Sequence, residues 1–315
     1  MNLNEVIRIG TRGSELALWQ ARWVQRILSA QWPGSAMVIE IIKTKGDRIL
    51  DASLAKRSDK GLFTREIEQA LLDGSIDLAV HSLKDLPTEL PSGLTIGAVS
   101  RREDVRDVFI PRPGNSVRTL LGQPYGATIA TGSLRRRSQI LSIRPDLVIA
   151  DIHGNLNTRM KKLEESTWGG MLLARAGVVR LGWEEVIGET LSAETILPAV
   201  GQGALGIEIR EGDQRVRSFV GVLADSAATQ ATSAERALLR CLGGGCQVPI
   251  GTYGRIETNV LKLDAMVGSL DGTRVVRGTV AGRPEEAEHL GVSLARQLLS
   301  KGADRILESI RSSSV

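Results

Sequence analysis

A cysteine, Cys246, stands in a glycine-rich segment where its sulfur could carry a large group. Glycines occupy positions 243–245 directly before it, and Pro249 and Gly251 follow within five residues. Glycine adopts turn conformations that are closed to other residues, so we expect Cys246 on an accessible loop rather than inside a helix. A chance cysteine in a glycine-rich turn is the alternative interpretation, and for an isolated motif it is the more common one.

Several arginines lie beside glycine or small polar residues, a pattern that favours a small polyanionic ligand. Arg12 follows Gly10-Thr11, and a run of three arginines at 135–137 comes shortly after Thr131-Gly132-Ser133. Arg159 lies beside small polar residues. A guanidinium offers forked donors to carboxylate or phosphate groups. The net charge of +4, from 40 basic and 36 acidic residues, is too small to indicate nucleic-acid binding by itself.

The first half of the chain reads as alternating strands and helices. Strands are expected at 6–9, 38–42, 76–81 and 127–130, and helices at 16–28 (with Ser14 as N-cap), 63–72 and 134–143. Two strand–helix turns contain Thr, Gly and Ser, where free backbone N–H groups and the helix dipole favour an anion. We therefore predict two similar doubly wound α/β domains that face a cleft, as in periplasmic binding proteins.

The C-terminal part has a different pattern. A helix is expected near 231–242, strands near 260–267 and 274–280 joined through Asp271-Gly272, and a helix over 285–299. This pattern predicts a small α+β domain that carries Cys246. The expected domains are 1–100 with 204–221, 104–198 and 225–315, with hinges near 100–104, 198–203 and 221–224.

The composition is that of an ordinary globular protein, with 42% hydrophobic and 24% charged residues. No stretch approaches the ~20 apolar residues needed to cross a bilayer, and the N-terminus lacks a secretory signal pattern. Two cysteines fit a reducing compartment. We expect a cytoplasmic monomer with no membrane partner, no nucleic-acid partner and no metal site. A phosphate-transfer enzyme is disfavoured because a Gly-x-x-x-x-Gly-Lys-Ser/Thr loop is absent.

A set of motifs, in order along nearly the whole chain, resembles one known family. The motifs lie at 9–14, 16–21, 60–64, 80–88, 102–104, 106–107, 132–136, 144–147, 154–159, 197–204 and 244–251. Together they resemble porphobilinogen deaminase, also called hydroxymethylbilane synthase, of the tetrapyrrole pathway. The resemblance implies a dipyrromethane cofactor held by a thioether to Cys246. It also implies that four porphobilinogen molecules are joined head to tail with loss of ammonia, before water releases hydroxymethylbilane.

The chemistry implied by the resemblance needs a fixed acid. Loss of ammonia leaves a cation whose charge spreads onto the pyrrole nitrogen, and a positioned carboxylate stabilises such a charge. The residue that matches the family's catalytic acid is Asp85, which we expect to be buried at a strand end. A capping or solvated aspartate is the alternative interpretation when its motif is considered alone.

The resemblance also implies that basic and polar side chains bind the acetate and propionate groups of the cofactor and of porphobilinogen. The expected cofactor- or substrate-binding residues are Arg12, Ser14, Gln20, Ser82, Lys84, Thr131, Ser133, Arg135, Arg136, His153, Arg159, Arg180 and Gln202. Arg137 is expected to be a solvated helix residue, and Lys60 to lie on a loop over the cleft.

His153 departs from the family pattern, which usually has arginine at this position. Imidazole is shorter and mostly uncharged at neutral pH. We therefore expect altered affinity rather than lost activity, unless Arg137 or Arg175 supplies the missing charge. The second cysteine, Cys241, is expected to pack against the core from its helix.

Two other classes of protein compete with the transferase hypothesis. Paired α/β domains with arginines in the cleft also describe solute-binding proteins and their regulatory relatives, which need no reactive thiol. Tight binding of carboxylated ligands without turnover would favour that hypothesis. A nucleic-acid binder that uses the arginines at 135–137 is weaker, because only 3% of the residues are aromatic.

Overall fold

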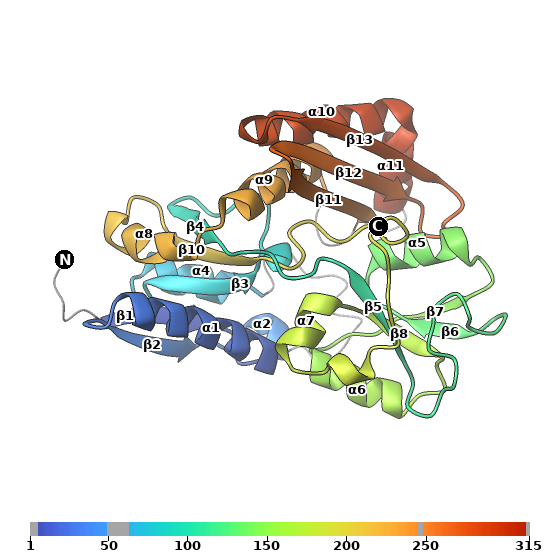
Figure 1. Ribbon diagram of the computed structural model, residues 1–315, viewed down its shortest axis with the longest axis horizontal. Coiled ribbons are helices and arrows are strands. Elements are labelled where there is room, and N and C mark those ends of the chain that lie inside the picture. The colour runs from blue at the N-terminus through green and yellow to red at the C-terminus, as the bar shows by residue number, and fades with distance from the viewer. Residues whose placement is uncertain (1–5, 49–62, 245–247, 313–315) are drawn as a thin grey trace. The chain divides into compact units, whose positions relative to one another are not determined.

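The computed structural model describes residues 6–48, 63–244 and 248–312. The chain forms two compact units, each made of two segments. Unit 1 comprises Met1–Glu103 and Ala204–Thr229, and unit 2 comprises Asp104–Gly203 and Gln230–Val315. Figure 1 shows the elements of both units along the chain.

Unit 1 contains a five-stranded mixed sheet in the order β2-β1-β3-β10-β4. The strands are β1 (Val6–Thr11), β2 (Ala36–Ile41), β3 (Leu78–Ser82), β4 (Leu94–Val99) and β10 (Leu205–Arg210). β1 pairs in parallel with β2 and β3, whereas β10 lies antiparallel between β3 and β4. The inner strands β3 and β10 are buried almost throughout, which explains their nearly continuous apolar sequences.

Helices cover both faces of this sheet. Unit 1 contains α1 (Glu15–Gln31), α2 (Lys45–Arg48), α4 (Arg65–Leu72), α8 (Gln214–Val220) and the 3₁₀ helices η1 (Leu83–Asp85) and η3 (Gly221–Leu223). One hydrophobic cluster joins α1 and α8 to alternate residues of β1, β3 and β10. A second cluster joins Ile67 and Leu71 of α4 to Ala79 of β3, on the other side of the strand.

Unit 2 repeats this architecture in its first segment. Its sheet has the order β7-β6-β8-β5-β9, with β6 parallel to β7 and β8, and β5 antiparallel to β8 and β9. The strands are β5 (Asp107–Pro111), β6 (Thr128–Ala130), β7 (Val148–Ala150), β8 (Gly170–Ala174) and β9 (Glu189–Thr190); the helices are α5 (Leu134–Ile143), α6 (Leu156–Glu164), α7 (Arg175–Arg180) and η2 (Glu184–Val186). The prediction of two similar α/β sheets is confirmed.

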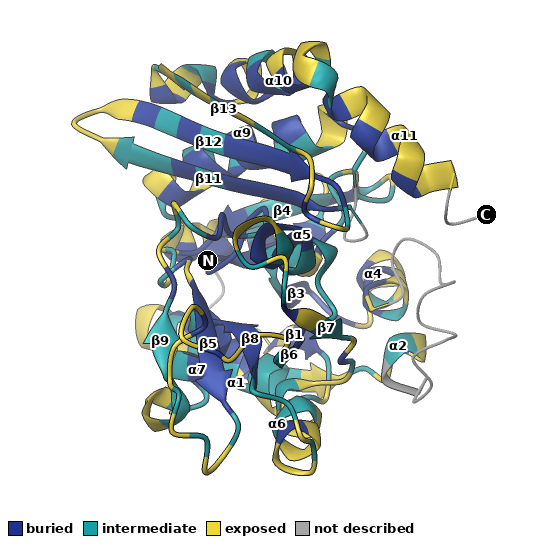
Figure 2. Ribbon diagram, turned by 90° about the vertical axis from the view of Figure 1, so that its right-hand side faces the viewer, coloured by how far each residue is buried: buried dark blue, intermediate teal, exposed yellow. Residues whose placement is uncertain are grey.

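The C-terminal part of unit 2 is an antiparallel sheet covered by helices, which confirms the predicted α+β pattern. Its elements are β11 (Ile250–Glu257), β12 (Val260–Gly268), β13 (Val275–Gly282), η4 (Pro284–Glu286), α10 (Ala287–Leu298), η5 (Leu299–Ala303), α11 (Asp304–Ser312) and the part of α9 (Ser226–Cys241) that follows Thr229. One hydrophobic cluster contains residues of β12, α9, α10 and α11. Figure 2 shows the buried and exposed sides of α11. Cys241 is exposed, so its predicted packing against the core is wrong.

The segment 198–203, predicted as a hinge, is bonded to other parts of unit 2. The Thr252 N–H donates to the Pro198 carbonyl at 2.9 Å. The buried Glu235 carboxylate accepts the N–H groups of Gly201 at 2.6 Å and Gly254 at 2.7 Å. These bonds tie the segment to β11 and α9. The division into three domains and their arrangement around a cleft stay predictions.

Candidate functional site

Asp85 is the last residue of the 3₁₀ turn η1, which continues directly from β3. The Leu83 N–H donates to the Ala204 carbonyl at 3.0 Å, and the Leu86 N–H closes the turn on the Leu83 carbonyl at 3.2 Å. Leu83 and Leu86 are buried in one cluster with Ala204. The Asp85 residue itself is exposed, so our expectation of a buried acid is wrong. The backbone of the turn is fixed, while the carboxylate reaches solvent.

Gln20 and Ser82 connect helix α1 to the end of β3. Gln20 is 2% exposed, and its Nε2 donates to Ser82 Oγ at 2.8 Å. A buried amide that is bonded in this way fixes the position of the Ser82 hydroxyl. The pair therefore orients the residue that directly precedes the Asp85 turn.

The turn between β1 and α1 presents Arg12 and Ser14. The Ser14 hydroxyl accepts the Ala17 N–H at 3.4 Å, which confirms Ser14 as the N-cap of α1. The half-buried Arg12 guanidinium carbon lies 4.2 Å from the centroid of the Phe63 ring, within cation–π range. Lys84, also half-buried, directly precedes Asp85 in the η1 turn.

In unit 2, Thr131 and Ser133 build the turn between β6 and α5. The Ser133 N–H donates to Thr131 Oγ1 at 3.2 Å, and Ser133 Oγ accepts the Arg136 N–H at 3.5 Å as the N-cap of the helix. The positive end of the helix dipole lies at this turn. The arrangement is one that favours a carboxylate.

Arg135 and Arg136 both pair with one buried acid, Asp107 at the start of β5. Arg135 Nη1 lies 2.8 Å from Asp107 Oδ2, and Arg136 Nη2 donates to Oδ1 at 2.8 Å. The two arginines are 4% and 5% exposed, and Asp107 is 0% exposed. Burial alone would raise the pKa of the Asp107 carboxyl, but the two guanidinium charges lower that pKa far below its usual range.

The two guanidinium groups have further contacts within unit 2. Arg135 Nη1 donates to the Leu197 carbonyl at 2.6 Å, and Arg136 Nη1 donates to the Leu172 carbonyl at 3.0 Å. Their Nε atoms are buried without a hydrogen-bond partner among the described residues. Two cations and one anion leave this buried group with a surplus of one positive charge.

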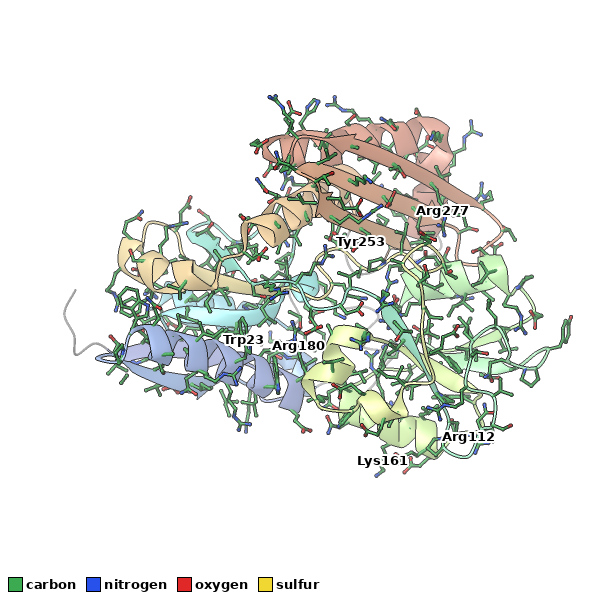
Figure 3. All side chains as sticks on the ribbon, in the orientation of Figure 1. Trp23, Arg112, Lys161, Arg180, Tyr253 and Arg277 are labelled. Atoms are coloured by element: carbon green, nitrogen blue, oxygen red, sulfur yellow. The ribbon has the colours of Figure 1, made fainter. Side chains whose placement is uncertain are left out.

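Gln202 and Arg180 also contact this part of unit 2. Gln202 Nε2 donates to Asp107 Oδ1 at 2.8 Å and to the Val105 carbonyl at 2.7 Å. Arg180, at the end of α7 and labelled in Figure 3, donates from Nη2 to the Gly203 carbonyl at 2.7 Å. Both residues are buried. Their hydrogen bonds connect the segment 198–203 to Asp107 of β5 and to α7.

His153 and Arg159 lie at a second helix N-terminus, that of α6. Asn155 Oδ1 caps this helix by accepting the Thr158 N–H at 2.9 Å, and Arg159 Nε donates to the Gly154 carbonyl at 2.8 Å. The His153 ring lies beside Gly132, where a Cβ would come within 3.3 Å of its Cε1 atom. His153 and the α5 turn are therefore neighbours.

Arg137 and Arg175, which were considered as sources of the positive charge that His153 lacks, have other contacts. Arg137 is half-buried and donates from Nε to the Leu270 carbonyl at 3.1 Å, so the expectation of a solvated residue is wrong. Arg175 Nη1 lies 3.5 Å from Asp104 Oδ2. Asp104 also accepts Arg106 Nε at 2.9 Å, which gives Arg106 an ion pair within its own loop.

Sequence reasoning missed Asp107 as a site residue. It belongs to the 106–107 motif, but an aspartate beside an arginine also fits a solvated surface pair. The signal that could have found it is its position as the first residue of β5, whose other residues are all apolar. A carboxylate buried there requires basic partners.

The predicted residues fall into two groups. Arg12, Ser14, Gln20, Ser82, Lys84 and Asp85 belong to unit 1; Thr131, Ser133, Arg135, Arg136, His153, Arg159, Arg180 and Gln202 belong to unit 2. Cys246 and Lys60 lie outside the described residues. Within the described ranges, no three His, Cys, Asp or Glu side chains form a group suited to a metal ion. No helix in these ranges is long and apolar enough to span a membrane.

Two family models match the chain. Residues 7–218 match the porphobilinogen deaminase dipyromethane cofactor binding domain, and residues 229–300 match the porphobilinogen deaminase C-terminal domain. A porphobilinogen deaminase of Chlorobaculum parvum is 52% identical over 312 residues, covering 98% of this chain and 99% of that protein. The corresponding protein of Carboxydothermus hydrogenoformans is 52% identical over 307 residues, covering 98% and 97%.

Solved structures with a partly similar fold include the L-cystine solute receptor of Neisseria gonorrhoeae. It covers 78% of this chain and 95% of its own, with 11% identity and a TM-score of 0.40. The Bordetella pertussis BvgS VFT2 domain covers 69% and 85%, with 13% identity and a TM-score of 0.42. At this similarity they say nothing about ligand or activity.

Proposed function

The chain belongs to the porphobilinogen deaminase family, and from this premise we propose how its own residues perform the family's reaction. That reaction joins four porphobilinogen molecules head to tail, with loss of ammonia, onto a covalently bound dipyrromethane, and then releases hydroxymethylbilane by hydrolysis. The observation that carries the proposal is the exposed Asp85 carboxylate on a turn whose backbone is fixed on both sides.

We assign Asp85 the role of the catalytic carboxylate, which stabilises positive charge. Porphobilinogen that loses ammonia becomes a cation, with its charge spread onto the pyrrole nitrogen. A carboxylate that is already in place stabilises this charge without reorganising during the reaction. The bonds at Leu83 and Leu86 hold the Asp85 backbone, and the Gln20–Ser82 bond holds the preceding residue.

The carboxylate-binding role is assigned to the helix N-termini and arginines of both units. In unit 2 the buried group of Arg135, Arg136 and Asp107 has a surplus positive charge and two Nε donors without partners among the described residues. This donor set fits the acetate and propionate groups of a dipyrromethane. Thr131, Ser133, His153 and Arg159 would contribute from the adjoining turns, and Arg12, Ser14 and Lys84 from unit 1.

When bound, the dipyrromethane supplies the pyrrole carbon to which the first porphobilinogen is joined. We assign its attachment to Cys246, on the sequence pattern of the family motif. Gln20, Gln202 and Arg180 donate hydrogen bonds to Ser82, to Asp107 and to the Gly203 carbonyl, so we assign them the positioning of Ser82, Asp107 and the 198–203 segment. We further propose a cytoplasmic monomer of three domains, with boundaries at 1–100 with 204–221, 104–198 and 225–315.

Intact-mass measurement tests the proposed function and the attachment site together. The purified protein is expected to be heavier than its sequence by one dipyrromethane, and Cys246→Ser is expected to remove this excess and the turnover of porphobilinogen. Cys241→Ser is the matched control, because Cys241 is an exposed thiol of the same protein. It should keep both the added mass and the activity.

Two results would contradict the proposal. A protein at its sequence mass with full turnover would exclude the covalent cofactor. Tight binding of carboxylated ligands without any turnover would favour a solute-binding protein instead.

A further inference from the structure

A buried glutamine on α5, Gln139, binds the backbone of Leu197 in the segment that follows β9. Gln139 is 0% exposed. Its Oε1 accepts the Leu197 N–H at 2.8 Å, and its Nε2 donates to the Leu197 carbonyl at 3.0 Å. One side-chain amide thus bonds both backbone polar groups of Leu197, which fixes the direction of the carbonyl.

The same carbonyl is also an acceptor for Arg135, one helical turn earlier on α5. Arg135 Nη1 donates to the Leu197 carbonyl at 2.6 Å and lies 2.8 Å from Asp107 Oδ2. This nitrogen carries two hydrogens, so the two contacts occupy it fully. The orientation of the Arg135 guanidinium therefore depends on where the Leu197 carbonyl and the Asp107 carboxylate are held.

In this orientation the Arg135 Nε–H is left for a ligand. Arg135 is 4% exposed, and its Nε is buried without a hydrogen-bond partner among the described residues. A buried donor that stays unbonded is costly, so native structures seldom contain one without a reason. A carboxylate oxygen on a pyrrole ring would satisfy this donor with a charge-assisted bond.

Strand β11 holds the Leu197 backbone from another side. A Cβ at Gly251 would lie 3.0 Å from the Leu197 carbonyl oxygen and 2.9 Å from the Leu197 Cβ, so the two residues approach closely. The next residue, Thr252, donates its N–H to the Pro198 carbonyl at 2.9 Å. The Leu197 carbonyl is thus held by both α5 and β11, and Gly251 ends the 244–251 motif that contains Cys246.

A second buried glutamine of unit 2 has a different kind of acceptor. Gln123 is 3% exposed, and its Nε2 donates to the carbonyls of Val117 at 2.9 Å and Thr119 at 3.0 Å. Within the described part of the chain, neither of these carbonyls is bonded to an arginine. Gln123 therefore fastens a loop, whereas the carbonyl that Gln139 binds also holds an arginine assigned to ligand binding.

We propose that Gln139 is a positioning residue for ligand carboxylates, which acts on Arg135 through the Leu197 carbonyl. It keeps Arg135 Nη1 on Leu197 and Asp107, and so leaves Nε available to a carboxylate oxygen. The inference rests on the proposed function, because that oxygen belongs to an acetate or propionate group of the bound dipyrromethane or of the incoming porphobilinogen.

The test removes the amide from the complete protein by Gln139→Met, which fills the space without polar atoms. The Leu197 carbonyl is then less restrained, and Arg135 no longer presents Nε in one position. Two quantities are measured: the fraction of chains with the added dipyrromethane mass, and the KM for porphobilinogen of the loaded chains. Either the fraction should fall by about half or more, or KM should rise about tenfold, with kcat per loaded chain within about threefold.

The two readouts distinguish the possible sources of the carboxylate. Loss of the added mass assigns the bond with Arg135 Nε to the cofactor. Full added mass with a raised KM assigns it to the incoming porphobilinogen. Either result supports the positioning role of Gln139.

A second substitution, Gln139→Glu, keeps the shape of the side chain and the acceptor for the Leu197 N–H. Its carboxylate does not donate to the Leu197 carbonyl, and it competes with the ligand for Arg135. The surplus positive charge of Arg135, Arg136 and Asp107 compensates the added negative charge, so this variant should fold. Its effect on added mass or KM should be at least that of Gln139→Met, and it decides the test if Gln139→Met fails to fold.

Gln123→Met is the matched control, because it removes a similarly buried amide of the same unit. Its midpoint of unfolding in urea should fall, as that of Gln139→Met does, but it should keep the added mass and the KM. If Gln123→Met changes either quantity as much as Gln139→Met, loss of stability explains both variants and the inference is overturned.

The remaining outcomes separate this inference from the proposed function. If the unsubstituted protein is loaded and active, unchanged added mass and KM in both Gln139 variants overturn the inference, since Arg135 is then held without the amide. If the unsubstituted protein lacks the added mass or the turnover, the proposed function itself fails.

Discussion

The two units differ in the exposure of their principal acids. In unit 1 the acid assigned to catalysis, Asp85, is exposed, and the buried ionisable side chains include His81, Glu208 and Glu68. In unit 2 the acid itself, Asp107, is buried and pairs directly with two arginines assigned to ligand binding. Unit 1 therefore presents one carboxylate from a rigid turn, whereas unit 2 preorganises its cations around a buried counter-charge.

The comparison shows that burial raises the pKa of both acids, and that the charged partners decide the direction of the net shift. Glu68 has a carboxylate nearby, and burial raises its pKa. Asp107 is also buried, but two guanidinium groups outweigh the burial and lower its pKa. Unit 1 should therefore lose stability as the pH rises from 4.5 through the raised pKa of Glu68, and unit 2 should lose stability as the pH falls from 3.8 through the lowered pKa of Asp107.

The largest effect is expected from Asp107→Asn, which removes the counter-charge of two buried arginines. Breaking a buried ion pair on one side typically costs about 3–5 kcal/mol, and the free energy of unfolding in urea should fall by about that amount. Asp104→Asn is the control, because Asp104 pairs with Arg106 and Arg175 in a half-buried loop. Its loss should be about 1 kcal/mol or less. Equal losses of unfolding free energy in the two variants would show that the buried ion pairs of Asp107 contribute no more to stability than the half-buried ones of Asp104.

A smaller effect is expected in the pH dependence of unfolding. Because the folded protein lowers the pKa of Asp107 below its usual 3.8, the stability from this group is present above that pH and is lost as the pH falls through the lowered pKa. The slope of unfolding free energy against pH, measured below about pH 4, should flatten in Asp107→Asn. An unchanged slope would mean that other carboxyl groups account for the acid limb.

The smallest effect is expected from His153→Arg, which introduces the arginine that the resemblance to the family implies at this position. Its forked, permanently charged donors should strengthen the binding of the carboxylates of porphobilinogen or of the cofactor, and lower KM about threefold to tenfold. Turnover should stay within about twofold, because the side chain lies at the α5 and α6 turns rather than beside Asp85 in sequence. Steady-state kinetics of both forms would decide, and no change in KM or kcat would remove His153 from the binding site.

Local sequence predicted the local structure well. Ser14 is the N-cap of α1, α5 covers the predicted 134–143, and Asp271-Gly272 lies in the connection between β12 and β13. These features depend on a few neighbouring residues, whose hydrogen bonds and backbone preferences are short-range.

Features that depend on long-range packing could not be predicted from the sequence. The exposure of Asp85 and Cys241, the contact of Arg137 with Leu270 and the burial of Asp107 all depend on which distant segments pack together. Glu208 could not be linked to His81 because β10 enters the sheet from a segment more than 100 residues further along the chain. Attachment at Cys246 stays a prediction, since that residue lies outside the described ranges.

The placement of β10 has a consequence for synthesis of the protein on the ribosome. The strand inserts between β3 and β4, yet it follows every strand of the β5–β9 sheet in the chain. Until it emerges, the nascent N-terminal segment has an open sheet with two unsatisfied edges where β10 will later lie. The middle of the chain can thus complete its sheet before the beginning does, and the time needed to translate the segment between β4 and the end of β10 sets how long the early strands stay open to mispairing.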